Sequence, residues 1–240
     1  MFKHWMKATA VAVLLGVSVL GCGAQEEAAV STQAEARYEK ISDTLYVDDA
    51  AVRVNDDQAG DAKQIKDQVE NLVLRVLHAS YQGRIGTVDG DFIKAPGLEA
   101  ELGARIAYLA QKYDDAEFAN TAAYLRINHF DIQDDAAKVI CDVAIKDPET
   151  GDVKVENHEG YVFVKDGDHW CLINDIVDTG RGGAKVLEAL VENTNPTDWK
   201  TTYSYENLKR SDYEDAPDFV AFLSDDGITA DPEKVSADAQ

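Results

Sequence analysis

The chain has 240 residues, 45% of them hydrophobic, and a formal net charge of -22 at pH 7. This is enough apolar material for one generous folded domain with tails or for two small domains. The negative charge argues against nucleic acid as a partner, because phosphates are bound by basic patches, and against electrostatic attachment to anionic lipid. Acidity of this size is more typical of a well-solvated surface than of one specific partner.

The first residues have the pattern of a secretory signal peptide. Lys3 and Lys7 give a positive start, residues 8–20 are uncharged and mostly apolar, and a glycine precedes Cys22. The apolar run is shorter than the roughly 20 residues that a membrane-spanning helix needs. The segment 19–22, Val-Leu-Gly-Cys, resembles the lipobox of bacterial lipoproteins, in which Gly or Ala precedes the lipid-bearing Cys.

This resemblance implies that residues 1–21 are a signal peptide that is removed, and that Cys22 carries the acyl chains of a membrane anchor. Each buried methylene contributes about 0.8 kcal/mol, so two or more chains hold a protein stably. Gly23, in place of Asp, implies that sorting to an outer membrane is permitted. The alternative is an uncleaved apolar anchor with an incidental cysteine. We expect a lipid-anchored protein of the bacterial cell envelope, with its folded part outside the cytoplasm.

Composition divides the rest of the chain into three parts. Residues 22–60 are rich in Ala, Glu, Gln, Asp and Ser, which predicts a flexible linker after the lipidated Cys, with residues 45–47 as a short strand at most. Residues 61–192 contain the periodic apolar patterns of a folded domain. Residues 193–240 are expected to form an acidic C-terminal extension.

The domain is predicted to begin with two amphipathic helices. Apolar residues within 65–77 fall on one helical face, and Asp61 is a suitable N-cap. A second helix follows Pro96, with apolar residues three or four apart within 98–113. Between residues 124 and 177 the period changes to two, which predicts four antiparallel strands joined by short turns.

The two faces of the predicted sheet differ in composition when residues are counted outward from the turns. We expect the helices to cover the more apolar and aromatic face. That face collects Tyr124, Arg126, Asn128, Phe130, Val139, Cys141, Val143, Ile145, Tyr161, Phe163, Cys171 and Ile173. The opposite face collects Leu125, Ile127, His129, Lys138, Asp142, Val162, Val164, Trp170 and Leu172. A register slip of one residue would exchange the two faces.

Helices followed by a curved antiparallel meander resemble the nuclear transport factor 2-like fold, a cystatin-like α+β cone. That family, which includes ketosteroid isomerase-like and polyketide cyclase-like members, packs helices on a bent sheet and leaves an open mouth. The resemblance covers about residues 61–177, rests on the order of the elements and includes no signature motif. It implies an α+β class with the N-terminal helices packed on a curved antiparallel sheet.

Ligand-binding candidates follow from the face expected to line the cone. They are Tyr124, Arg126, Asn128, Tyr161 and Phe163. An arginine on a covered face needs an anionic partner, and a ligand could provide one. The alternative is that Arg126 pairs with an acidic residue of the same domain, such as Glu117 or Glu159.

Cys141 and Cys171 are expected to be buried free thiols. The strand between theirs separates the two Cα atoms by about 9.6 Å, and a disulfide spans no more than about 7 Å. The secreted location alone would favour a bridge.

Asp142, His158 and His129 could form an acid–base pair or a zinc site. Our register places them on the outer face, where such residues are usually solvated partners. His78 and Tyr81 could line the mouth of the cone, although packing between elements is the commoner role.

We expect the folded part to bind a small ligand or another envelope protein without catalysis, and to use no cofactor and no metal. One alternative is a lyase or isomerase with an Asp or His base in the cone, because proton abstraction beside a carbonyl needs a tuned base. The other alternative is a scaffolding protein that acts through its acidic surface. An enzyme would need an acid or base inside the pocket, whereas a binding protein needs only a lined cavity.

Overall fold

The structure is a computed structural model, and it describes residues 37–84, 90–113, 115–178 and 180–208. All of these lie within one compact unit, Ala36–Gln240. The predicted signal peptide, Cys22 and most of the acidic extension lie outside the described residues. No helix within the described ranges is both long enough and apolar enough to cross a bilayer.

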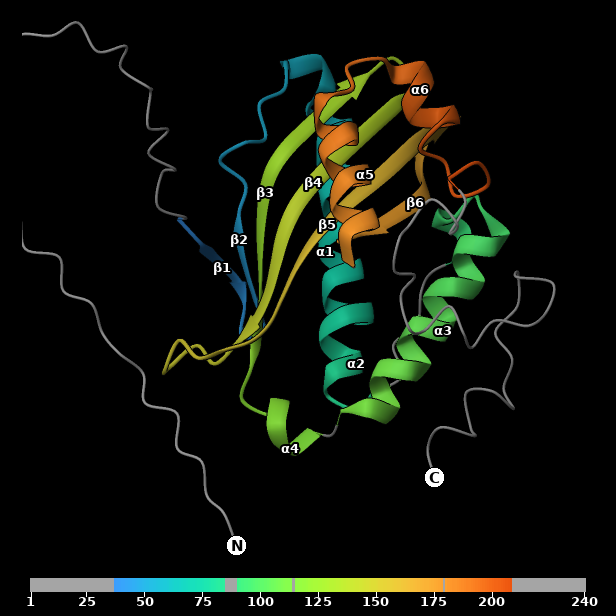
Figure 1. The fold of residues 1–240 in the computed structure, drawn as a ribbon. Coiled ribbons are helices and arrows are strands. Elements are labelled where there is room, and N and C mark those ends of the chain that lie inside the picture. The colour runs from blue at the N-terminus through green and yellow to red at the C-terminus, as the bar shows by residue number, and fades with distance from the viewer. Residues whose placement is uncertain (1–36, 85–89, 114, 179, 209–240) are drawn as a thin grey trace, which may run out of the picture. The chain divides into compact units, whose positions relative to one another are not determined.

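A six-stranded curved sheet forms the centre of this unit, with the strands in the order β1 to β6 (Figure 1). Neighbouring strands are antiparallel, except that β2 and β3 are parallel. The strands are β1 (Glu39–Ser42), β2 (Leu45–Asp48), β3 (Ala122–Gln133), β4 (Ala136–Lys146), β5 (Val153–Asp166) and β6 (His169–Val177). The predicted four-stranded meander is therefore confirmed as β3 to β6.

Strands β1 and β2 lie in the stretch for which we expect a linker. Leu45 and Val47 alternate with Tyr46, and both are buried in the core. Strand β2 then pairs with β3, with Leu45 opposite Ala123 and Val47 opposite Leu125. The sheet thus begins before residue 61, because two alternating apolar residues were enough to bury one face of a short strand.

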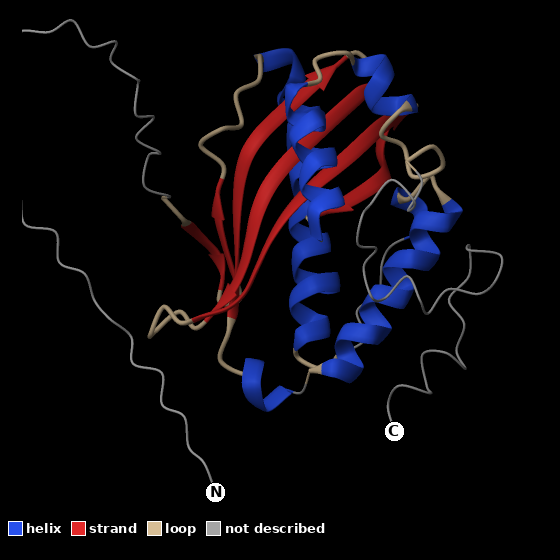
Figure 2. Cartoon of the chain, viewed as in Figure 1, coloured by secondary structure: helices blue, strands red, loops and turns tan. Residues whose placement is uncertain are grey.

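Helices lie on both faces of the sheet (Figure 2). The helical segments are η1 (Asp56–Gln58), α1 (Ala59–Leu72), η2 (Val73–His78), α2 (Ala79–Tyr81), η3 (Gly90–Phe92), α3 (Pro96–Lys112), α4 (Asp115–Phe118), α5 (Gly180–Glu192) and α6 (Pro196–Thr201). The α1–η2–α2 run and α3 cover one face, as predicted. The α+β class is therefore confirmed, and α5 and α6 add a second helical layer.

The larger core lies between the sheet and the α1–η2–α2 run with α3. Strand β4 contributes Val139, Cys141 and Val143 to it, as predicted, and β5 contributes Tyr161 and Phe163. These side chains are all 2% exposed or less. Because burial of apolar surface stabilises by about 25 cal/mol for each square ångström, this core, with more buried apolar residues, contributes more than the smaller core described next.

A smaller core lies between the opposite face of the sheet and α5 with α6. Ile140 and Val162 of the sheet pack there with Leu187 of α5 and Trp199 of α6. Gly160 allows the close approach of α5, since a Cβ atom at this position would lie 2.5 Å from a terminal methyl of Leu187. The domain therefore extends past residue 192.

Strand β3 presents the opposite face from the one predicted for its first half. Phe130 lies in the larger core as expected, but a bulge between Ile127 and His129 shifts the register. Leu125 and Ile127 therefore lie in the larger core, where Tyr124, Arg126 and Asn128 were expected. One extra residue in a strand inverts the alternation beyond it, which is why counting from the turn failed here.

The side chains at the start of β6 also face the opposite side of the sheet from the one predicted, because the turn between β5 and β6 is shorter than predicted. Asp166 pairs directly with His169, so the turn has two residues, and Gly167 takes a positive φ of 61°. Trp170 and Leu172 consequently enter the larger core, where Cys171 and Ile173 were expected. A two-residue turn that needs positive φ at Gly is the common hairpin connection.

Cys141 and Cys171 are both buried and free, which confirms the prediction. Cys141 lies in the larger core on β4, and Cys171 lies on β6 opposite Val164 of β5. The intervening β5 keeps the two thiols apart.

Candidate binding pocket

The residues predicted to line a ligand cone are divided between the two faces of the sheet. Tyr161 and Phe163 are fully packed in the larger core. The first half of β3 faces the opposite way from the prediction, which places Tyr124, Arg126 and Asn128 on the other face of the sheet. The predicted five-residue site does not come together, since it required an uninterrupted alternation along β3.

Tyr124 is enclosed by neighbouring side chains. Its ring stacks on Tyr46 of β2 at 4.6 Å between centroids and meets the edge of Tyr38 at 5.2 Å. The ammonium of Lys146 lies 3.8 Å from the centroid of the same ring. These contacts join β2, β3 and β4, so Tyr124 acts as a packing residue.

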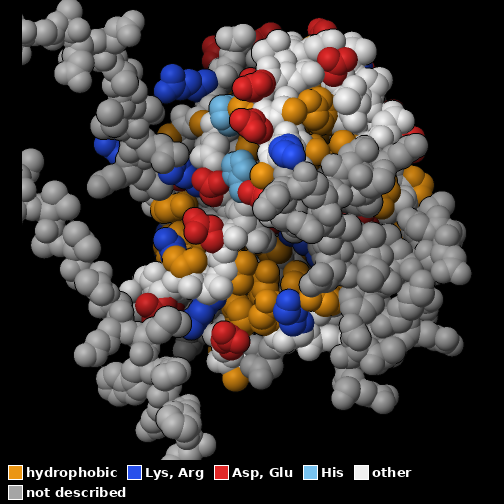
Figure 3. All heavy atoms as spheres, viewed as in Figure 1, with side chains coloured by type: hydrophobic (Ala, Val, Ile, Leu, Met, Phe, Trp, Pro, Cys, Tyr) orange, Lys and Arg blue, Asp and Glu red, His pale blue; other side chains and the backbone are white. Residues whose placement is uncertain are grey.

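Arg126 and Asn128 belong to a polar cluster on the outer face of the sheet. Asp142 of β4 accepts hydrogen bonds from His158 Nδ1 at 2.6 Å and from Asn128 Nδ2 at 2.8 Å. Arg126 stands opposite Asp142 in the register, and its charge helps to lower the pKa of that carboxyl. Figure 3 shows histidine and acidic side chains next to each other on the face that carries α5. The expected placement of Asp142 and His158 on the outer face is thus correct.

The hydrogen bond between His158 and Asp142 shifts both pKa values. It raises the pKa of His158 above the usual 6.5 and, as the first cause, lowers the pKa of Asp142 below 3.8. The stabilisation by His158 is therefore complete below about pH 6.5 and is lost as the pH rises through the folded-state value. The stabilisation by Asp142 is complete above about pH 3.8 and is lost as the pH falls through its folded-state value. Both contributions are present between these limits.

Replacing His158 by Gln is therefore expected to cost about 0.5–1 kcal/mol of unfolding free energy near pH 5, and less near pH 8. The cost is small because the two side chains of the pair are 35% and 38% exposed. Urea denaturation at the two pH values measures the difference. His129→Gln, on an exposed position of β3, is the control and should show no such pH dependence. An equal loss at both pH values would contradict the assignment.

The interior of the predicted cone holds a buried ion network. Arg105 of α3 donates to Glu159 and to Asp175, each at 2.8 Å, and the hydroxyl of Tyr161 donates to Glu159. The three charged side chains are 6% exposed or less. Burial disfavours the charge on Arg105, but the two carboxylates raise the pKa of its guanidinium above the usual value. The partner of Glu159 is thus Arg105, where we considered Arg126.

His78 and Tyr81 pack between elements. His78 Nε2 lies 3.0 Å from the carbonyl oxygen of Thr121, and the Tyr81 ring stacks with Phe118 at 5.2 Å. Burial lowers the pKa of His78 and raises the pKa of Tyr81 to about 12. Both residues therefore pack between elements, and neither is among the residues that line the pocket described next.

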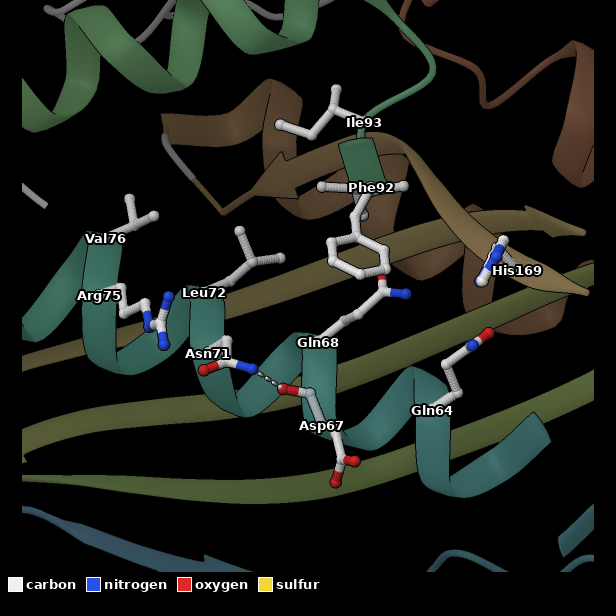
Figure 4. Close-up of a pocket in the computed structure, with 11 residues that line it drawn as sticks. Gln64, Asp67, Gln68, Asn71, Leu72, Arg75, Val76, Phe92, Ile93 and His169 are labelled. Atoms are coloured by element: carbon white, nitrogen blue, oxygen red, sulfur yellow. Dashed lines mark hydrogen bonds between the residues drawn. The ribbon is translucent and has the colours of Figure 1, made fainter. Parts of the chain in front are cut away.

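A pocket of about 440 Å³ lies outside the predicted cone, beside the edge strand β6 (Figure 4). Its walls come from the α1–η2 run, from η3 with the residue that follows it, and from β6. It is lined by Gln64, Asp67, Gln68, Asn71, Leu72, Arg75, Val76, Phe92, Ile93, His169 and Leu172. This volume is within the range of about 300–1,000 Å³ that is typical of small-molecule sites.

Two sets of backbone contacts hold the pocket walls together. Gln64 accepts from the Trp170 N–H at 2.7 Å, and Gln68 donates to the Trp170 carbonyl, which fixes α1 against β6. On the other side, Ile93 forms a parallel bridge with Leu172, and the Lys94 N–H donates to the Leu172 carbonyl at 2.9 Å. Because the edge of β6 is covered by these groups, the pocket is a preformed gap between fixed walls.

A π-helical stretch, η2, lies at one end of the pocket. It begins directly after Leu72 and contains Arg75 and Val76. A π-helix has more residues in each turn than an α-helix, and such stretches are frequent at functional sites. Helical periodicity in the sequence predicted one continuous helix here and gave no sign of this change.

No group of three or more His, Cys, Asp or Glu side chains in the described ranges could hold a metal ion. The zinc site considered for Asp142, His158 and His129 is therefore not formed among them. His129 is exposed on the far side of the β3 bulge, whereas the other two contact each other.

No protein-family model matches this chain. No curated protein matches it either. Among solved structures, the chain is similar to a crystal structure from Nostoc punctiforme that is described as a domain of unknown function with a cystatin-like fold. The two share 9% sequence identity with a TM-score of 0.29, over 56% of this chain and 90% of that chain. A likeness this distant says nothing about function, and the α+β class rests on the elements described above.

Proposed function

We propose that this chain is a lipid-anchored protein of the bacterial cell envelope whose nuclear transport factor 2-like domain binds a small molecule without catalysis. The observation that carries the proposal is the pocket between α1, η3 and β6. Its apolar side chains can desolvate a ligand, and its polar side chains can orient one, as small-molecule sites require.

The buried charges support a binding role over the lyase or isomerase alternative. Glu159 and Asp175, which lie in the predicted cone, both pair with Arg105 and are therefore held as ion-paired carboxylates. A general base must instead reach a substrate within hydrogen-bonding distance. His158 and Asp142 contact each other on the outer face and do not line the pocket.

Native mass spectrometry of the protein purified from its own host tests the proposal. We expect the wild-type chain to retain a noncovalently bound small molecule. Leu72→Trp should abolish this added mass, because the larger ring fills the pocket that Leu72 lines. Val153→Trp is the matched control, since Val153 is 54% exposed on β5 and lies outside the pocket. A bare wild-type chain, or the same retained mass in Leu72→Trp, would overturn the pocket assignment.

The same mass spectrum tests the anchor. The proposal requires a mature chain that begins at Cys22 and carries the mass of two or more acyl chains. A chain that retains residues 1–21, or that carries no acyl mass, would refute the anchor and leave the binding result to be judged by itself.

A further inference from the structure

The pocket is elongated along the helical run that forms its floor. Gln64 and Arg75 line it and are eleven residues apart, which is about 16 Å at about 1.5 Å per residue. In Figure 4, Arg75 and His169 lie toward opposite ends of the row of lining residues, with Leu72 and Phe92 between them. An extended ligand can contact this row of residues along its length, whereas a compact one cannot.

Apolar side chains from three elements line the pocket. They include Leu72 from α1, Phe92 and Ile93 from the segment at η3, and Leu172 from β6. The Asn71 amide between Arg75 and Asp67 donates to the Asp67 carbonyl. The amides of Gln64 and Gln68 beside them are already engaged by the backbone of Trp170. Because these amides are engaged, the walls favour a hydrocarbon chain over a ligand rich in hydroxyl groups.

The charge of the pocket is concentrated at one end. Among the described residues that line it, Arg75 is the only lysine or arginine, and its side chain forms no ion pair within the described part of the chain. Asp67 is the lining acid, and its charge is already balanced by Lys63 at 2.5 Å. The charge left over for a ligand is therefore positive and lies at the Arg75 end.

From this arrangement we propose that the ligand is an amphipathic anion with an extended apolar chain, whose carboxylate or phosphate group pairs with Arg75. The inference rests on the proposed binding function of the same pocket and adds the chemical class of the ligand. A guanidinium presents a planar fork of donors that matches a carboxylate or phosphate group. The apolar chain then runs past Leu72 and Phe92 toward His169, which is exposed.

The test compares two probes of equal chain length, dodecanoate and dodecanol, by isothermal titration calorimetry. The protein is the chain from residue 23 onward, which contains the whole compact unit Ala36–Gln240 and no acyl chains. Arg75→Gln is expected to weaken dodecanoate binding about tenfold and to change dodecanol binding less than about twofold. Arg84→Gln is the matched control, because Arg84 is exposed shortly after α2 and does not line the pocket.

The possible outcomes separate this inference from the function on which it rests. If both probes bind the wild type and Arg75→Gln affects them equally or not at all, the anionic class is wrong and the binding function stands. If neither probe binds, the inference is overturned, and the retained mass in the host-purified protein still decides whether the pocket binds a molecule.

A third outcome concerns the chain itself. The Tyr205 N–H donates to the Ile173 carbonyl, so the described chain ends beside β6, close to the pocket wall at Leu172. If the probes bind only to a chain that stops at Leu208, then the C-terminal segment of this chain is the occupant. That result would also overturn the inference.

Discussion

Replacing Arg105 by Ala is expected to lower the free energy of unfolding by about 3–5 kcal/mol. Arg105 is the cation between Glu159 and Asp175, and all three side chains are buried beneath α3. Without the guanidinium, two carboxylates would remain close together in the interior with no balancing charge between them. Breaking a buried ion pair costs far more than breaking an exposed one, because the remaining charge cannot recover its hydration.

Urea denaturation, followed by circular dichroism, measures this loss. Arg84→Ala is the control, because an exposed arginine is expected to change stability by less than about 0.5 kcal/mol. Arg105→Met adds a second test. It retains the packing of the aliphatic stem but removes the charge, so it should show most of the loss in unfolding free energy that is expected for Arg105→Ala. A loss below about 1 kcal/mol in both Arg105 variants would show that the network does not hold α3 on the sheet.

Lys138→Met is expected to lower the free energy of unfolding by about 2–4 kcal/mol. The ammonium of this buried lysine donates to the carbonyls of Leu190, Val191 and Asn193, at distances of 2.7–2.9 Å. These groups lie at and just after the end of α5, where helical carbonyls have no partner within the helix. Methionine preserves the apolar stem but leaves the three carbonyls without their charged donor.

Hydrogen exchange identifies where the stability is lost in this variant. The amides of α5 and α6 should exchange faster, while those of α1 and α3 should change little, because Lys138 contacts only the second helical layer among these elements. Lys63→Met is the matched control, since the Lys63 side chain is 74% exposed on α1. Uniformly faster exchange across all the helices would contradict a local role.

The sequence predicted the helices and the meander because their apolar periods are regular over many residues. Apolar residues recur every three or four positions within 65–77 and 98–113. In β4, every second residue from Val139 to Ile145 is apolar and faces the larger core. The prediction of which side chains face the helices failed for β3 and β6, because in each strand it depends on one residue. The bulge before His129 leaves no mark in an alternating pattern. The turn does, since Gly167 and Asp168 match a two-residue hairpin connection, but we counted it as three residues.

The candidate site could not be predicted for a different reason. Its walls meet because Ile93 pairs with Leu172, and these residues are far apart in the sequence. No local period reports such a contact. Arg105 was missed similarly, since only the fold shows that its helix faces Glu159 and Asp175. The packing of α6 was also missed, because Trp199 is the one buried residue of a short and otherwise polar helix.

Strand β2 pairs with β3 on one side and with β1 on the other, so β1, the first described strand, forms the edge of the sheet. Strand β1 has four residues, all exposed, and pairs only with β2 in the described sheet. Any tension applied through the residues before Arg37 would therefore load this edge first. We expect the short β1 to separate from β2 under such tension, while the Arg105 network and the pocket at the opposite edge stay intact.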